Sequence, residues 1–329
     1  GKPAFGVGPG NVPAIIERTA DVDKAVADIV AGKAFDNGLL CSAENSIVCD
    51  APVERQVLEL LPKYKAYLCN ADEKRKLEQT LAPRGRLNTA LAGQDAPLIA
   101  QRAGFSVPAD TRVLVVRLEK VGREEEPLSI EKLSPVLGLY VEDGWRACCS
   151  RAIEILKLGG LGHSLGIHSM DADVIDAFFR EKPAFRICVN TMVAMGATGY
   201  TTGLAPAMTL GPGSWGGSIT SDNITPLHLI NIKRLAYEVR SLTRATPSPA
   251  PGLLQDDAVE AGVSPGAIAQ PPSMPGGRCP VPQVLTGTAV EPPAPERAAA
   301  AVAVGGLTPA EVSRIVADFL AQYRASARS

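Results

Sequence analysis

The stretch SIVCDAPVERQVLELL (residues 46–61) combines a short apolar run with an amphipathic run. SIVCD (46–50) has the length and composition of a buried β-strand. Pro52 stands where a helix accepts proline in its first turn, and the apolar residues after it repeat at helical spacing. These are Val53, Val57, Leu60 and Leu61. A strand followed directly by a helix predicts an α/β unit.

The same alternation extends from residue 12 to about residue 190. Helices are expected over 21–34, 143–158 and 171–181, each with an aspartate at its start that can cap it. Further strands are expected over 66–69, 112–119, 136–142, 163–169 and 185–191. Strands that alternate with helices pair in parallel and are covered by those helices. We therefore predict an α/β fold with a parallel sheet flanked by helices.

The composition changes in the second half of the chain. Past Asn190 the residues are mainly Gly, Thr, Ser and Pro, which predicts loops, and LHLINIKRLAYEV (227–239) has the pattern of a strand and then a helix. Residues 246–306 are rich in Pro, Ala and Gly and have few large apolar side chains, so a flexible linker is expected. Residues 307–329 predict an amphipathic helix, in which Thr308 and Glu311 form a capping box.

Charge and cysteine usage exclude several classes of protein. The 33 basic and 35 acidic side chains give a formal charge of -2 with no basic block, which argues against a nucleic-acid partner. No apolar run approaches the roughly 18 residues of a membrane span. The seven cysteines lack metal-ligand or disulfide spacing, and the three histidines do not cluster with them. We expect a soluble, cytoplasmic protein with free thiols and no metal.

The segment AFDNGLLCSAENSIV (34–48) places Cys41 in a loop between a helix that ends near Asn37-Gly38 and a strand. A cysteine is nucleophilic when it is partly exposed and has neighbours that favour the thiolate, whereas buried cysteines behave as small apolar residues. Cys41 is therefore a candidate catalytic nucleophile. From the residues alone, another reduced cysteine without a catalytic role is the alternative.

Several stretches from Lys2 to about Arg240 resemble, in order and spacing, the CoA-acylating branch of the aldehyde dehydrogenase superfamily. They are GVGPGNVPAIIERTADVDKAV, FDNGLLCSAE, AGFSVP, EKLSPVL, GGLGHS, VNT, GLAPAMTLGPGSWGG and SDNITPLHLINIKR. The resemblance implies a catalytic domain over 1–211 and a segment over 212–245 that returns to the cofactor and oligomerisation region. It also implies that an N-terminal cofactor-binding part is missing, because the sequence opens abruptly at GKPAFG.

The resemblance assigns roles to three residues. Cys41 matches the family nucleophile, and its backbone N–H would help to hold the oxyanion. Glu131 of EKLSPVL matches the glutamate that holds the nicotinamide ribose, and His163 of GGLGHS matches a histidine that can exchange a proton near the cysteine. The residues alone also allow a solvated carboxylate at Glu131 and a hydrogen-bonded core histidine at His163. His168 and His228 are expected to be structural.

A missing carboxylate favours acyl transfer over hydrolysis. Hydrolytic aldehyde dehydrogenases carry a glutamate near this point that activates water, whereas the matching position here is Val7 or a close neighbour. A thiolate of CoA needs less help from a base than water does. The implied reaction is the reversible, NAD-dependent oxidation of propanal or acetaldehyde to acyl-CoA through a cysteine thioester. Gly8-Pro9-Gly10 lacks a G-x-G-x-x-G context and is interpreted as a structural turn.

The predicted helix at 307–329 resembles the encapsulation peptides that attach enzymes to bacterial microcompartment shells. The resemblance implies a homo-oligomer inside a microcompartment, with a shell protein as partner. A dimerisation helix or a disordered tail is the alternative for this segment. For the whole chain, two other functions stay open: a hydrolytic aldehyde dehydrogenase, and a non-catalytic truncated subunit that serves as microcompartment cargo or assembly module.

Overall fold

The structure is a computed structural model that describes residues 4–237. Residues up to Asn231 belong to one compact unit. The expected linker at 246–306 and the expected helix at 307–329 lie outside the described residues.

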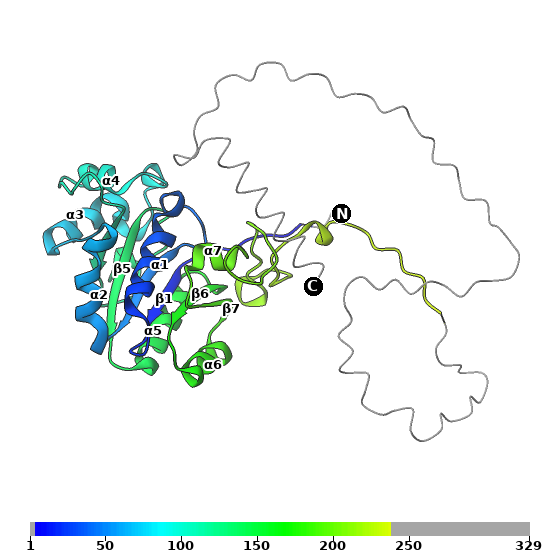
Figure 1. The fold of residues 1–329 in the computed structure, drawn as a ribbon. Helices are drawn as coiled ribbons and strands as arrows, with labels where there is room; N and C mark the ends of the chain where they lie inside the picture. Colours follow the sequence, from blue (N-terminus) through cyan, green and yellow to red (C-terminus); the bar gives the residue numbers. More distant parts are fainter. Residues whose placement is uncertain (1–3, 238–329) are drawn as a thin grey trace, which may run out of the picture. The chain divides into compact units, whose positions relative to one another are not determined.

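One parallel sheet forms the centre of this unit (Figure 1). Its strands lie in the order β3-β4-β5-β2-β1-β6-β7, and every pairing between neighbours is parallel. The strands are β1 (Val12–Ile16), β2 (Glu44–Asp50), β3 (Ala66–Leu68), β4 (Val113–Arg117), β5 (Val136–Glu142), β6 (Gly162–His168) and β7 (Ala184–Val189). This confirms the predicted fold class.

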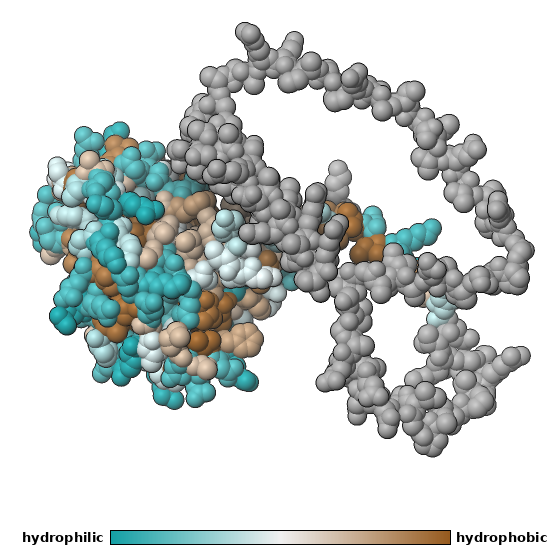
Figure 2. Space-filling view, in the orientation of Figure 1, coloured by the Kyte–Doolittle hydropathy of each residue, from teal (hydrophilic) through white to brown (hydrophobic). Residues whose placement is uncertain are grey.

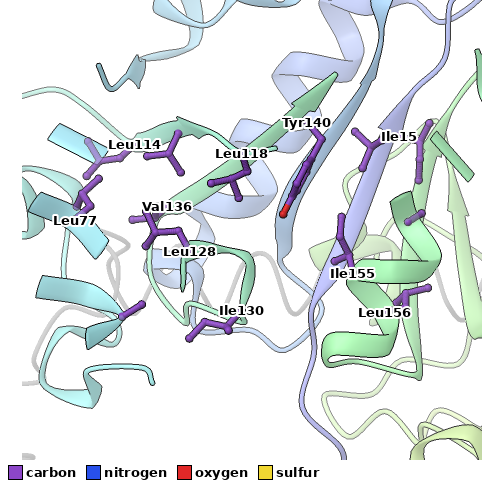
Figure 3. Packing of buried hydrophobic residues seen from close by; sticks show 14 of the residues in the cluster. Ile15, Leu77, Leu114, Leu118, Leu128, Ile130, Val136, Tyr140, Ile155 and Leu156 are labelled. Atoms are coloured by element: carbon purple, nitrogen blue, oxygen red, sulfur yellow. The ribbon is translucent and has the colours of Figure 1, made fainter. Parts of the chain in front are cut away.

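Helices cover both faces of the sheet, with separate apolar cores beneath them. The helices are α1 (Val22–Ala34), α2 (Glu54–Leu60), α3 (Ala71–Leu81), α4 (Ala96–Arg102), α5 (Trp145–Leu158), α6 (Ala172–Glu181) and α7 (Val193–Ala197). Helices α1 and α2 share one buried cluster with the sheet, and α3 to α6 share the other. Figure 3 shows the second cluster, where Tyr140 of β5 and Ile155 of α5 are among the buried side chains.

The predicted helix starts are largely confirmed. Asp21 accepts a hydrogen bond from Lys24 N at the start of α1, and Asp171 caps α6. Pro52 lies in a 3-10 turn just before α2. Asp143 was expected to begin α5, but Gly144 occupies the cap position instead, with a φ of 85° that favours glycine.

Two helices and part of the tail pattern depart from expectation. The sequence analysis did not predict α3 or α4, although Asn70 and Glu73 form a capping box at the start of α3. The strand and helix expected at 227–239 are wrong for the described part, where only Pro226–His228 forms a short 3-10 turn. Leu229, Ile230 and Leu235 are exposed there. A helix or strand is stabilised mainly by burying an apolar face, and each of these residues is more than half exposed.

The surface of the described unit is mostly hydrophilic in the face that Figure 2 shows, with smaller apolar patches between. Among residues 4–237, no helix combines the length and apolar character that crossing a bilayer requires.

Candidate functional site

The three predicted site residues lie on the side of the sheet where the strands begin. Cys41 precedes β2, Glu131 precedes β5, and His163 is the second residue of β6. Because these strands are parallel, their amino ends lie on the same side of the sheet; the charge of Glu131 acts on Cys41 there, whereas β1 separates His163 of β6 from β2. Open α/β sheets more often bind ligands beyond the carboxyl ends of their strands. The candidate site therefore lies at the amino ends of the strands, opposite the carboxyl ends where ligands more often bind.

A tight turn brings Cys41 to this edge. After α1 the chain passes through Asp36 and Asn37, which adopt φ values of 49° and 48°. Asp and Asn accept this left-handed conformation more readily than most residues. Asn37 Nδ2 then donates a 3.0 Å hydrogen bond to the carbonyl of Gly93, which fixes the turn to a neighbouring loop. Cys41 follows in a loop and is partly buried, as the sequence predicts.

A cavity of about 180 Å³ opens beside Cys41. One wall comes from the cysteine loop, and the other carries Thr198 and Met208 from the segment after α7. The remaining lining residues are Asp36, Leu39, Leu40 and Ser42. Two contacts tie α7 to the cysteine loop and to the start of β2: Ser42 Oγ donates to Ala194 O at 3.3 Å, and Glu44 of β2 accepts from Val193 N.

Gly10 lies between Cys41 and Glu131. Its backbone N–H donates a 3.0 Å hydrogen bond to Glu131 Oε1. A Cβ atom at this position would lie 1.8 Å from the carbonyl oxygen of Cys41. Only glycine, which has no side chain, allows the backbone just before β1 to approach the cysteine so closely. The turn that was interpreted as structural therefore packs directly against the candidate nucleophile.

The surroundings of Cys41 favour the protonated thiol. Burial raises the pKa of the Cys41 thiol, and the nearby Glu131 carboxylate raises it further. The backbone N–H of Cys41, the charge of Arg186 and the N–H of Ser42 lower that pKa in part. Since the balance is upward, thiolate formation requires either removal of the proton by a base or a change around Glu131. The N–H groups at the sulfur can also stabilise an oxyanion that forms there.

His163 is fully buried in β6. Burial lowers its pKa to about 4, and Arg186 contributes to that shift, so the imidazole is neutral at pH 7. Nδ1 lies 3.0 Å from Ser164 Oγ, and Nε2 has no hydrogen-bond partner among the described residues. A neutral ring with a free nitrogen can accept a proton. His163 does not line the cavity at Cys41, so its proposed role stays a prediction.

Two residues of the site were missed by the sequence analysis. Gly10 lay in a turn without a recognised ligand motif. Arg186 lies in β7, is nearly fully buried, and acts electrostatically on both Cys41 and His163. The available signal was a single arginine inside the apolar strand FRICVNT, because charged residues are almost never fully buried without partners.

Other expectations concern metals, cysteines and histidines. Within residues 4–237, no group of three or more His, Cys, Asp or Glu side chains is arranged to hold a metal ion. The described cysteines are free thiols. His168 is buried in β6, and His228 lies beside Thr225 at a 3-10 turn.

Comparisons with known proteins show which proteins the chain resembles. No family model matches the chain. The aldehyde-alcohol dehydrogenase of Clostridium acetobutylicum is 39% identical over 241 residues, which cover 72% of this chain and 28% of that protein. An acetylating aldehyde dehydrogenase structure from Geobacillus thermoglucosidasius is 42% identical, with a TM-score of 0.71, over 74% of this chain and 54% of that one.

A more distant structure carries information about ligands. The propionaldehyde dehydrogenase of Rhodopseudomonas palustris, solved with bound CoA and an acylated cysteine, is 25% identical with a TM-score of 0.60. The match covers 67% of this chain and 49% of that one. The chain thus spans about half the length of the two solved aldehyde dehydrogenases and less than a third of the aldehyde-alcohol dehydrogenase. Sequence and fold together show that the matched part of the chain is homologous to acylating aldehyde dehydrogenases, whose length it covers only in part.

Proposed function

We propose that this chain carries the acyl-transfer site of an NAD-dependent, CoA-acylating aldehyde dehydrogenase, with Cys41 as the nucleophile. The observation that carries the proposal is the position of Cys41: a partly buried loop thiol at a small cavity, where the backbone N–H groups of Cys41 and Ser42 lower the pKa of the thiol in part. Nucleophilic cysteines need this combination of access and nearby donors.

Cys41 would add to the carbonyl carbon of the aldehyde and later hold the acyl group as a thioester. The N–H groups of Cys41 and Ser42 would stabilise the oxygen of the tetrahedral adduct. The thiol of CoA would then attack the thioester and release Cys41. His163, neutral and with a free Nε2, would accept the proton of that thiol. The opposite sequence of steps gives the reverse reaction.

Glu131 is the proposed contact for the nicotinamide ribose of NAD. One carboxylate oxygen accepts from Gly10, which leaves the second oxygen able to accept a bond from a ribose hydroxyl. NAD, when bound, supplies the acceptor for the hydride of the aldehyde. Because the chain spans about half the length of its acylating relatives, the activity of the whole protein is itself part of the proposal.

A short aldehyde, propanal or acetaldehyde, is the proposed substrate. The cavity of about 180 Å³ has room for a short chain beside the sulfur, and most of its lining is apolar. The propionaldehyde dehydrogenase with bound CoA supports both the chain length and CoA as acceptor. The absence of a carboxylate at Val7 favours CoA over water, because valine cannot activate water.

The organisation of the longer protein is also proposed. Residues 1–211 would form the catalytic domain, 212–245 would return to the cofactor and oligomerisation region, and 246–306 would be a linker. Residues 307–329 would bind a microcompartment shell protein, which would place a homo-oligomeric enzyme inside a cytoplasmic microcompartment. A propionaldehyde dehydrogenase from the fucose utilisation microcompartment of Clostridium phytofermentans supports this setting. Removal of 307–329 should abolish shell association and leave the chemistry of Cys41 unchanged.

The test uses the half-reaction that needs no NAD. The chain is incubated with propionyl-CoA, and intact-protein and peptide mass spectrometry locate the acyl group. We expect a propionyl adduct on Cys41 that is absent from Cys41→Ala and retained in Cys49→Ala, which removes a buried cysteine of β2. No adduct, or adducts spread over several cysteines, would contradict the proposal.

The same adduct separates acyl transfer from hydrolysis. After removal of free propionyl-CoA, the thioester should persist in buffer and disappear when CoA is added. Loss in buffer alone would indicate the hydrolytic alternative. A chain that never acquires an adduct would instead agree with a non-catalytic subunit.

A further inference from the structure

Arg186 joins four segments of the chain at the amino edge of the sheet. It lies near the start of β7 and is only 3% exposed. Its Nε donates to Asn223 Oδ1 at 2.7 Å, and Nη1 donates to the carbonyls of Gly211 at 2.9 Å and His163 at 3.3 Å. Nη2 donates to Ser221 O at 2.8 Å. One planar guanidinium therefore links β6 to two stretches of the segment that follows α7, one at Gly211 and one at Ser221 and Asn223.

Asn223 extends this link to the cavity wall. Its Nδ2 donates to the carbonyl of Ala197 at 2.9 Å and to that of Ala205 at 2.7 Å. These two carbonyls lie on either side of the loop that begins with Thr198. The backbone of Asn223 also pairs with Leu210, and Ile224 N donates to Thr209 O at 2.9 Å. This pairing lies directly beside Met208.

Thr198 and Met208 are the two cavity-lining residues contributed by this segment. They belong to a stretch with little regular structure, since α7 ends at Ala197. Their positions depend on a few hydrogen bonds rather than on a helix or sheet ladder. Buried polar groups such as Asn223 cost free energy when their bonds are broken, so the linked geometry is held firmly.

We propose that Arg186 and Asn223 form a positioning pair that fixes the Thr198–Met208 wall opposite Cys41 and thereby limits the length of the acyl chain. The inference rests on the proposed acyl-transfer function of Cys41. Neither residue contacts the reacting atoms; both affect the reaction by fixing the positions of Thr198 and Met208. The fixed fork of arginine is essential to this role because lysine cannot direct several donors in one plane.

The charge of Arg186 has a second, separable effect. Among the described residues, Arg186 takes part in none of the ion pairs, although the charge of Asp222 acts on it. Its charge lowers the pKa of Cys41 and, after burial, that of His163. Arg186→Lys keeps the positive charge but removes the planar set of donors that makes the four hydrogen bonds of Arg186. Its effect on chain-length selection can therefore be compared with its effect on thiol reactivity.

The experiment measures the initial rate of Cys41 acylation by propionyl-CoA and by hexanoyl-CoA. The ratio of the two rates measures how strongly the Thr198–Met208 wall selects against the longer acyl chain. Asn223→Asp keeps the acceptor for Arg186 and removes both donors to Ala197 and Ala205. Asn223→Ser serves if Asn223→Asp does not fold, as judged by thermal unfolding. Asn190→Asp is the matched control, since its amide donates to Ser169 O at 2.9 Å beyond the carboxyl end of β7.

We expect the unsubstituted chain to favour propionyl-CoA and the Asn223 variants to bring the ratio closer to one by at least about fivefold, the factor for one buried hydrogen bond. Met208→Ala and Arg186→Lys should shift the ratio in the same direction, and Asn190→Asp should not. Iodoacetamide alkylation of Cys41 should stay within about twofold in Arg186→Lys. An unchanged ratio, or an equal loss for both acyl groups, overturns the positioning role. Failure of the unsubstituted chain to be acylated at all overturns the proposed function, and the positioning role with it.

Discussion

The backbone N–H of Gly10 donates a 3.0 Å hydrogen bond to Oε1 of Glu131. The α-carbon of the same glycine lies against the carbonyl of Cys41, where a side chain would overlap it. One residue therefore sets the spacing between the candidate nucleophile and the candidate ribose ligand. Because the two candidate residues are 90 positions apart in the chain, this spacing exists only in the folded sheet.

Gly10→Ala should disable the site with little effect elsewhere. The added methyl group would lie 1.8 Å from Cys41 O, so the backbone of the cysteine loop must move. A displacement of this size at a reacting group can cost roughly 100-fold in rate. We expect such a loss in propionylation of Cys41. Gly6→Ala is the control, because a Cβ there meets nothing within 4 Å. Equal rates for the two variants would contradict the close approach.

Glu131→Gln should make Cys41 more reactive. Burial is the first cause that raises the pKa of the Cys41 thiol, and the carboxylate of Glu131 is the second. The substitution removes the second cause, so the thiolate fraction at pH 7 rises. The pH midpoint of iodoacetamide alkylation should therefore move downward. Glu124→Gln, at an exposed position before Glu131, should leave the midpoint unchanged. A midpoint that does not move in Glu131→Gln would mean that this carboxylate does not act on the thiol.

His168 should reduce stability in acid. Burial lowers its pKa to about 4, while Asp28 opposes and Lys24 assists this shift. In the unfolded chain the pKa is near its ordinary value of 6.5, so between pH 6.5 and 4 the unfolded state binds a proton that the folded state does not. Stability contributed by neutral His168 is thus present above pH 6.5 and is lost as the pH falls, by about 1.4 kcal/mol per pH unit.

The measurement is chemical denaturation of the unsubstituted chain and of His168→Gln from pH 7.5 to 4.5. The difference in unfolding free energy isolates His168, because Glu44, whose pKa burial raises to about 8, titrates in both proteins. The difference should shrink or reverse toward acid pH. A constant difference would show that His168 ionises alike in the folded and unfolded states.

Leu77→Ala should destabilise the fold without a direct effect on the site. Leu77 of α3 is fully buried in the cluster that α3 to α6 share with the sheet (Figure 3). Removing a buried leucine side chain typically costs about 2–5 kcal/mol. Gln79→Ala, at an exposed position of the same helix, should stay within about 0.5 kcal/mol. Urea denaturation gives both values, and similar costs for the two variants would argue against the described packing of α3.

Most of the fold was predictable because the strands have clear local signals. SIVCD and VLGLYVE are continuous apolar runs, as parallel strands buried on both faces require. Asp21 and Asp171 mark helix starts through bonds to backbone N–H groups within three residues. Helices α3 and α4 were missed because they lie in polar or short stretches, where the capping box of Asn70 is the main signal. For residues 227–239 the pattern predicted a strand and a helix that the described part does not form. An apolar pattern leads to burial only if a partner surface exists.

By itself, the sequence determined the parallel α/β class, the loop position of Cys41 and the residues that match an acylating aldehyde dehydrogenase. These depend on local pattern or on motif order along the chain. Only the tertiary structure decided that Gly10 lies between Cys41 and Glu131, that burial and Glu131 raise the pKa of the thiol, and that Arg186 and Asn223 are hydrogen-bonded to each other and to the segment after α7. The physical reason is that close approach, desolvation and hydrogen bonding between distant segments arise when the strands align, and no local pattern encodes them.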